Sequence, residues 1–254
     1  VLVPNAVNTA HFSMPVAPRR IQEIQESLDK NMGDVFVITT SRLVHKNAVD
    51  DMIRALAFLP GNVHFIVLGT GPDESILRKL ASKLGVSGRV RFVGQVGHAD
   101  MPAYLKACDI FIRASRSEGM GNSFVEAMAA ELPVIATQEG GIADFLFDPV
   151  RNRARAQARP EGASGRAISN GVDEKLASEF GMPDKDLDYQ TGWAVDKDSP
   201  EQIAGAVKEI MSRPEKVRSV VATAKSMVIE KYDWDLIARD MKEKVFDPLF
   251  TKRG

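Results

Sequence analysis

The sequence predicts an α/β fold in which a Rossmann-like parallel sheet carries helices on both faces. Two observations support this prediction. Short, continuously apolar segments recur between Val35 and Thr137, and segments with the apolar spacing of helices separate them. Parallel strands need such crossover helices, and strands covered on both faces are apolar throughout rather than alternating. In sheets of this kind, ligands bind beside the carboxyl ends of the strands.

Expected strands and helices alternate along the first half of the chain. Strands are expected at residues 35–40, 63–68, 90–93, 107–113 and 133–137. Helices are expected at 47–59, 73–84, 101–106 and 122–131, and again at 200–211, 214–231 and 233–246. The first of these helices is typical, because Val49, Met52, Ile53, Leu56 and Leu59 fall on one face. The turn Gly69-Thr70-Gly71 lacks the third glycine of a dinucleotide fingerprint, so a tight turn is the better interpretation.

Composition excludes several classes of protein. The 254 residues are 44 % hydrophobic and 26 % charged with a net charge of −1, which is typical of a soluble globular protein and gives no basic field for nucleic acid. The single cysteine, Cys108, allows no intrachain disulfide and is interpreted as a core thiol rather than a nucleophile. No apolar run reaches membrane-spanning length and no signal peptide is evident, so a cytoplasmic location is expected.

Residues 118–126 are the most informative stretch. Glu118 and Glu126 bracket a glycine-containing loop that leads into a helix. Free amides at a helix start attract anions, and glycine lets a ligand approach closely. Carboxylates accept hydrogen bonds from sugar hydroxyls. The alternative for Glu126 is a helix capping box with Ser123, a role that involves no ligand.

Arg42 ends the first expected strand, where a guanidinium can grip a diphosphate bidentately and stabilise the charge of a leaving group. His45 and Lys46 in the same loop add positive charge. An equally open alternative is that Arg42 forms a surface salt bridge with Asp50 or Asp51.

Two further charge patterns are interpreted as structural or solvated. Asp-x-Asp pairs can hold a divalent cation, but these are read as turns or, for Asp233, a helix cap, and no metal site is expected; they are Asp184/Asp186, Asp186/Asp188, Asp196/Asp198 and Asp233/Asp235. An arginine run in the irregular segment at about 148–190 is read as a solvated loop, with contact to anionic lipid or a charged acceptor as the minority alternative. Its members are Arg151, Arg153, Arg155, Arg159 and Arg166.

Taken in order, the motifs resemble the C-terminal, donor-binding half of a retaining GT-B glycosyltransferase of the family 4 (group 1) type. Residues 3–12 are similar to that family's inter-domain linker, and residues 118–126 to its E-x7-E signature. Other matching segments are residues 41–50, 68–72, 90–94, 133–142 and 191–195.

The resemblance implies roles for individual residues. Arg42 would bind the diphosphate, Glu118 the hydroxyls of the donor sugar, and these two are the expected catalytic residues. Glu126 would take the ribose hydroxyls, which outweighs the capping alternative. The family's lysine falls at Asn47 here, and Lys46 is a substitute one position earlier. The implied donor-binding set is Arg42, Lys46, Asn47, Gly69, Gly71, Phe92, Gly94, Glu118, Gly119, Met120, Gly121, Asn122 and Glu126.

The resemblance also implies an organisation and a reaction. Residues 1–12 would be a linker remnant and 13–250 the nucleotide-sugar-binding domain, with an N-terminal half missing as partner. The reaction would be transfer of a sugar from a UDP- or GDP-linked donor to an acceptor hydroxyl with retention, without metal or other cofactor. The isolated chain would bind nucleotide but turn over weakly, and the full-length enzyme could contact a membrane peripherally. The alternatives are a non-catalytic nucleotide-binding module and a sugar-nucleotide epimerase or phosphorylase of the same architecture.

Overall fold

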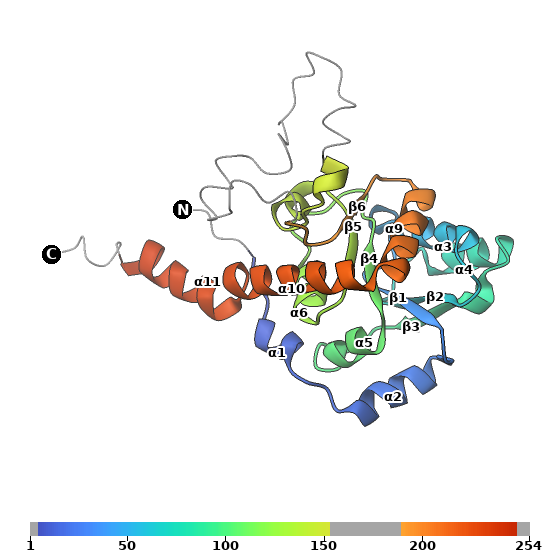
Figure 1. Ribbon diagram of the computed structural model, residues 1–254, viewed down its shortest axis with the longest axis horizontal. Coiled ribbons are helices and arrows are strands. Elements are labelled where there is room, and N and C mark those ends of the chain that lie inside the picture. Colours follow the sequence, from blue (N-terminus) through green and yellow to red (C-terminus); the bar gives the residue numbers. More distant parts are fainter. Residues whose placement is uncertain (1–4, 153–188, 248–254) are drawn as a thin grey trace, which may run out of the picture.

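The computed structural model describes residues 5–152 and 189–247, and within them a six-stranded sheet forms the centre of the molecule (Figure 1). All neighbouring strands pair in parallel, in the order β3-β2-β1-β4-β5-β6. The strands are β1 (Val35–Thr40), β2 (Val63–Leu68), β3 (Val90–Gly94), β4 (Ile110–Arg113), β5 (Val134–Thr137) and β6 (Trp193–Val195). The predicted fold class is confirmed.

Helices cover both faces of this sheet. They are α1 (Thr9–Ser13), α2 (Pro18–Ser27), α3 (Val49–Ala55), α4 (Glu74–Lys83), α5 (Met101–Ala107), α6 (Asn122–Ala129), α9 (Pro200–Ser212), α10 (Pro214–Lys231) and α11 (Trp234–Met241), which continues into a π-helical segment (Lys242–Phe246). One apolar cluster joins the sheet to α1, α2, α5, α6 and α10, and a second joins it to α3, α4 and α9. In β1, Phe36 and Ile38 enter the first cluster and Val37 the second, so the strand is apolar throughout because both of its faces are buried.

The strand order places a topological switch point between β1 and β4. From β1 the chain proceeds outward through β2 to β3, whereas β4 lies on the other side of β1 and is followed outward by β5 and β6. The crossovers on the two sides therefore diverge at this point. The loops after β1 and β4 lie at the carboxyl edge of the sheet beside this point, which is where open parallel sheets bind ligands.

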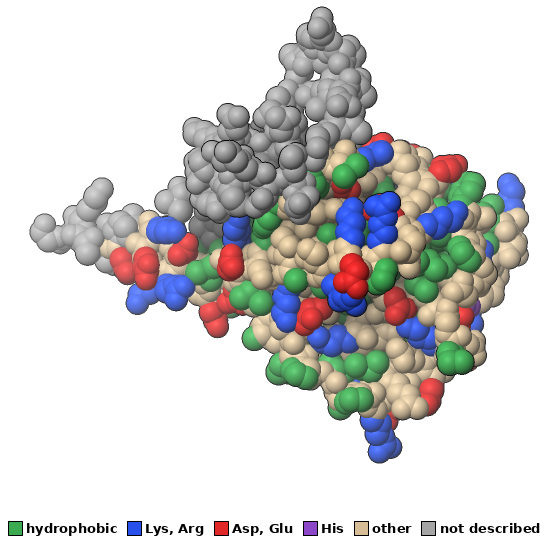
Figure 2. Space-filling view, viewed as in Figure 1, with side chains coloured by type: hydrophobic (Ala, Val, Ile, Leu, Met, Phe, Trp, Pro, Cys, Tyr) green, Lys and Arg blue, Asp and Glu red, His purple; other side chains and the backbone are tan. Residues whose placement is uncertain are grey.

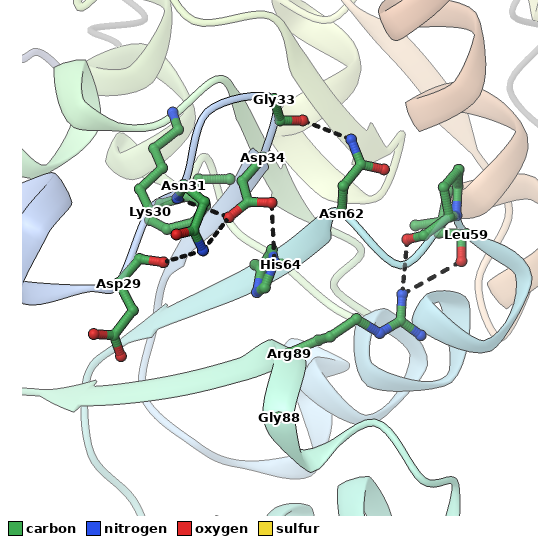
Figure 3. A network of polar contacts seen from close by, with 12 residues as sticks. Asp29, Lys30, Asn31, Gly33, Asp34, Leu59, Asn62, His64, Gly88 and Arg89 are labelled. Carbon is green, nitrogen blue, oxygen red and sulfur yellow. Dashed lines mark hydrogen bonds and ion pairs between the residues drawn. The ribbon is translucent and has the colours of Figure 1, made fainter.

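The opposite, amino-terminal edge is closed by its own polar contacts (Figure 3). Asp34, before β1, accepts a hydrogen bond from the amide of Asn31 at 2.8 Å and lies 3.6 Å from Nε2 of His64. That amide hydrogen bond lowers the pKa of Asp34. Arg89 donates to the carbonyl oxygens that end the preceding helical segment, with Leu59 O at 3.3 Å. These groups satisfy one another, so this edge is structural.

Some expected boundaries were wrong. The strand expected at 107–113 begins only at Ile110, because α5 continues to Ala107 and Cys108 donates its amide to Leu105 O. The helix expected at 122–131 ends at Ala129, and Glu131 adopts a left-handed conformation with φ of 67°. Cys108 is buried, and burial raises the pKa of its thiol, which agrees with a core thiol.

The helix expected at 47–59 is shorter than predicted. A 3₁₀ turn (His45–Asn47) precedes α3, and a second 3₁₀ turn (Leu56–Phe58) follows it. Ala48 separates the first turn from α3 with φ of 53°, in the left-handed region. Helix α2 was not anticipated, although Pro18 stands at its first position, where proline is favoured.

The first described residues pair with the junction between α10 and α11. Val7 pairs with the α10–α11 junction: its amide donates to Tyr232 O and its carbonyl accepts from Trp234 N, both at 2.9 Å. Asp233 caps α11 by accepting from the amide of Asp235 at 3.0 Å, so its interpretation as a cap is confirmed. The division into a linker at 1–12 and a domain at 13–250 stays a prediction. Most of the expected insertion, residues 153–188, and its Asp-x-Asp pairs lie outside the described residues.

Candidate functional site

The candidate site lies at the switch point, where the loop after β1 (residues 41–48) meets the loop after β4 (residues 114–121). The backbone joins the two loops, because the amide of Arg116 donates to Lys46 O at 2.8 Å. The residues predicted to bind the diphosphate and the sugar come from these two loops, so the fold places Arg42 and Glu118 at the same edge of the sheet.

Arg116 clamps the two loops together. Its guanidinium donates to the carbonyl of His45 at 2.7 Å and to three carboxylates: Asp50 at 2.8 and 3.0 Å, Asp51 at 2.7 Å and Asp198 at 2.6 Å. Burial and the neighbouring Asp50 charge raise the pKa of Asp51 to about 6 even though Arg116 opposes the rise. Arg116 therefore binds Asp50 and Asp51, the two carboxylates that the sequence suggested as partners of Arg42.

Arg42 is therefore not a salt-bridge partner of Asp50 or Asp51, and that alternative was wrong. Its residue is exposed, and within the part of the chain that the structure describes its guanidinium contacts no carboxylate. Lys46 is also exposed. The hydroxyls of Thr39 and Ser41 beside them are buried without a hydrogen-bond partner among the described residues. Among the described residues, this edge thus offers a cation that no carboxylate neutralises.

Asn47 is placed differently from Arg42 and Lys46. It is 2 % exposed, and its side chain is engaged at both ends. Nδ2 donates to Arg42 O at 2.6 Å, and Oδ1 accepts from Arg113 Nη2 at 3.1 Å. Direct contact of Asn47 with a donor stays a prediction. Its side-chain amide stabilises the loop after β1 by binding the carbonyl of Arg42.

Glu118 is held by Arg113, the last residue of β4. Arg113 Nη2 lies 2.6 Å from Glu118 Oε2, and the two side chains are only 12 % and 11 % exposed. The same guanidinium donates to Ser115 Oγ at 3.2 Å and to Ser123 Oγ at 2.9 Å. Oε1 of Glu118 accepts from the amide of Gly119 at 3.1 Å. A carboxylate has about four acceptor positions, so Glu118 keeps capacity for sugar hydroxyls.

Helix α6 begins at the same edge of the sheet, directly after the loop that carries Glu118, and its amino-terminal end has no side-chain cap. Its N-cap is Gly121, with φ of 71°, and no side chain caps it or carries negative charge in its first turn. The capping-box alternative for Ser123 and Glu126 was wrong, because the helix begins at Asn122 and Ser123 accepts from Arg113 instead. An uncapped helix start carries about half a positive charge and unsatisfied amides, a favourable place for an anion.

Glu126 lies one turn further along α6, beside a pair of histidines. Its Oε1 is 3.8 Å from His98 Nε2, and the rings of His98 and His11 are stacked with centroids 5.2 Å apart. Burial raises the pKa of Glu126, while His98 and His11 work against the rise. The side chain is 18 % exposed, so the carboxylate stays accessible at the rim of the site.

Glycines allow the loops of the site to pack backbone against backbone. A Cβ on Gly140 would lie 2.0 Å from Glu118 O, and Gly141 donates its amide to Gly119 O at 2.7 Å. A Cβ on Gly69 would lie 2.0 Å from Ser41 O, and Gly71 is equally close to Leu43. The glycines at 69 and 71 thus support the arginine loop, as the tight-turn interpretation expected; whether they also approach phosphates stays a prediction.

The remaining predicted residues lie around this centre. Gly119 and Asn122 are exposed and Met120 is half-buried, in the turn between Glu118 and α6. Phe92 and Gly94 are in the edge strand β3, and the carbonyl of Gly94 accepts from Gly69 N at 2.7 Å. The ring of Phe92 is covered by the guanidinium of Arg78 at 4.4 Å. Contact of this strand with a base stays a prediction.

Sequence reasoning missed Arg113, Arg116 and His98. Arg113 carried a signal that was overlooked, since a charged residue closes an otherwise apolar strand at the edge where ligands bind. Arg116 and His98 gave no local signal, because their partners come from distant segments.

Other features of the described residues bear on function. No group of three or more His, Cys, Asp or Glu side chains among them is placed to hold a metal ion. None of their helices combines the length and the apolar character needed to cross a bilayer. On the face drawn in Figure 2, basic and acidic side chains are interspersed over the body of the molecule, in line with a net charge of −1.

Comparison with known proteins identifies the family. A family model described as "Glycosyl transferases group 1" matches residues 20–160. A lipopolysaccharide core biosynthesis glycosyltransferase, LpsE of Rhizobium meliloti, is 39 % identical over 121 residues, which cover 48 % of this chain and 35 % of that protein. A GDP-mannose-dependent phosphatidylinositol monomannoside mannosyltransferase of Mycobacterium tuberculosis is 26 % identical over 217 residues, or 82 % of this chain and 46 % of that one. The chain thus spans less than half the length of these relatives.

Solved structures show the same fold. HepE of Anabaena, in complex with UDP and glucose, superposes with a TM-score of 0.75 at 19 % identity over 96 % of this chain and 56 % of its own. The C-terminal domain of LpcC, a group 1 glycosyl transferase of Francisella tularensis, gives a TM-score of 0.62 at 23 % identity and is covered over 99 % of its length. The chain therefore belongs to the group 1 glycosyl transferase family and has the fold of a GT-B C-terminal-type domain.

Proposed function

We propose that this chain is the donor-binding half of a retaining glycosyltransferase and that it binds a nucleotide sugar at the switch point of its sheet. One observation carries the proposal. The loops after β1 and β4 bring together at one edge of the sheet a guanidinium that contacts no carboxylate among the described residues, an uncapped helix start and a carboxylate. The two positive groups match the diphosphate of a nucleotide sugar, and the carboxylate matches its sugar.

The positive groups would receive the diphosphate. Arg42 can donate two parallel hydrogen bonds to phosphate oxygens, and the amides at the start of α6 can donate to the same group. Charge grows on the leaving nucleoside diphosphate as the glycosidic bond breaks. Fixed positive groups aimed at that charge stabilise the transition state without reorganisation, and in this proposal no metal ion is required.

The carboxylates would select the sugars. Glu118, oriented by Arg113, would accept hydrogen bonds from hydroxyls of the transferred sugar, and Glu126 from those of the ribose. HepE binds UDP and glucose, and the M. tuberculosis relative is GDP-mannose-dependent, which supports a UDP- or GDP-linked donor. The acceptor would be bound mainly by an N-terminal half. The lipid in the M. tuberculosis relative's name supports a cytoplasmic enzyme that meets its acceptor at a membrane surface.

Calorimetry of this chain tests the proposal. We expect heat of binding with UDP or GDP, and a loss of affinity of roughly 10- to 100-fold for Arg42→Ala, the equivalent of one charge-assisted hydrogen-bonding group. Arg19→Ala is the matched control, because that side chain is 91 % exposed and pairs with Glu23 along α2. The proposal is wrong if UDP, GDP and ADP all fail to bind, or if the two arginine variants behave alike.

A further inference from the structure

The structure contains a buried polar chain that links the two halves of the candidate site. It runs from Arg42 O to Asn47 Nδ2 at 2.6 Å, from Asn47 Oδ1 to Arg113 Nη2 at 3.1 Å, and from Arg113 Nη2 to Glu118 Oε2 at 2.6 Å. We call Asn47 and Arg113 the relay. The relay connects Arg42, which the proposed function places against the diphosphate, with Glu118, which it places against the sugar.

We propose that Arg113 is the positioning residue of this site, which sets the orientation of the Glu118 carboxylate toward the donor sugar. Asn47, which the resemblance had offered as a donor contact, is assigned here to orienting Arg113 instead, because both ends of its side chain are already engaged, and in this proposal neither relay residue contacts the donor. This inference rests on the proposed function, because it gives Glu118 its sugar-binding role.

The geometry supports positioning rather than direct binding. Arg113 is 12 % exposed in its side chain, and its Nε, Nη1 and Nη2 all donate to protein groups, namely Ser115, Ser123, Asn47 and Glu118. A planar guanidinium with its donors fixed on four sides cannot turn to meet a ligand. It can, however, hold a carboxylate oxygen in one place, since charge-assisted hydrogen bonds are short and directional.

The site also explains why this role falls to an arginine. Glu118 lies in a loop between a strand and a helix, where a long side chain has many rotamers. Arg113 takes Oε2, and the Gly119 amide takes Oε1, so both oxygens are oriented by the protein. A carboxylate that is oriented before the donor arrives loses less side-chain entropy on binding, which raises affinity for the sugar specifically.

Titration calorimetry can separate this role from others. The measured quantity is the sugar increment, the ratio of the Kd for UDP to that for UDP-glucose, with GDP and GDP-mannose as the second pair of probes. We expect Arg113→Gln and Glu118→Gln each to lower the increment about 10-fold, the effect of one charge-assisted hydrogen bond. The Kd for the plain diphosphate should change by no more than about twofold, the scatter of uncoupled sites.

A double-mutant cycle supplies the decisive comparison. Because Arg113 acts through Glu118, the double variant should lose no more than Glu118→Gln alone, and Asn47→Ala should reduce the increment only when Glu118 is present. Arg19→Ala, whose side chain is 91 % exposed and pairs with Glu23 on α2, is the control and should keep the increment. Should Arg113→Gln fail to fold, Arg113→Lys keeps the charge but not the fork and should still lower the increment.

Three outcomes would overturn the inference: multiplicative losses in the double variant, an unchanged increment in Arg113→Gln while Glu118→Gln lowers it, or equal losses for UDP and UDP-glucose. A wild-type chain that binds UDP or GDP without any sugar increment would overturn it as well. A wild-type chain that binds no nucleotide at all would instead count against the proposed function.

Discussion

Replacing Gly140 with alanine tests how the two loops of the site are packed. Gly140 has φ of 58°, and an added Cβ would lie 2.0 Å from Glu118 O and 3.1 Å from Gly119 O. The contacted atoms are backbone, so a rotamer change cannot relieve the clash. Alanine in the left-handed region costs about 1–2 kcal/mol, and forcing a packed backbone apart costs about 1–3 kcal/mol more. We therefore expect a loss of about 2–5 kcal/mol in the free energy of unfolding.

Gly85→Ala is the control that separates the two terms. Gly85 has φ of 69°, but an added Cβ there would meet nothing within 4 Å. It should lose only the conformational term, a decrease in Tm of roughly 2–8 °C for a chain of this size. Gly140→Ala should fall further and should also weaken UDP-glucose binding in calorimetry, because Glu118 must move. Equal Tm values and equal affinities for the two variants would refute this account of the loop packing.

Three other perturbations follow from the same geometry. Arg116→Met leaves Asp50 and Asp51 without their shared partner, so urea unfolding should show a loss of about 3–5 kcal/mol in the free energy of unfolding. A variant as stable as the wild type would contradict the role of Arg116 in joining the two loops. Burial raises the pKa of Asp51 to about 6, so the stability this carboxyl contributes is full below its ordinary value of 3.8 and is lost as the pH rises through about 6. Asp51→Asn should therefore gain stability relative to wild type between about pH 4 and pH 7, and a pH-independent difference would be inconsistent. Glu126→Gln should erase the preference of the chain for UDP over 2′-deoxy-UDP in calorimetry, whereas a retained preference would remove Glu126 from the ribose site.

The sheet could be predicted from the sequence because its strands are buried on both faces. The strands expected at 35–40 and 63–68 have the observed bounds, since continuous apolar runs of this length fit a parallel sheet and little else. The strand at 107–113 was too long by three residues for the opposite reason: Ala107 and Cys108 are equally apolar but belong to the end of α5. Apolar character alone does not separate a buried strand from the buried end of a helix.

The site could be predicted only as far as its local motifs reach. Arg42 and Glu118 were found because each follows a strand in a recognisable motif. Arg116 was missed because its partners Asp50 and Asp51 lie 66 and 65 residues earlier in the chain, whereas Arg113 was missed although it ends an apolar strand at the edge where ligands bind. Local pattern even misled for Ser123 and Glu126, whose spacing fits a capping box although the left-handed Gly121 begins the helix before Ser123.

The most direct test of the central claim is a crystal structure of this chain with UDP-glucose or GDP-mannose bound. We predict density for the diphosphate between the Arg42 guanidinium and the amides that begin α6, with the sugar against Glu118 and the ribose toward Glu126. A donor bound at the amino-terminal edge of the sheet, or one whose diphosphate lies away from both Arg42 and α6, would contradict the account.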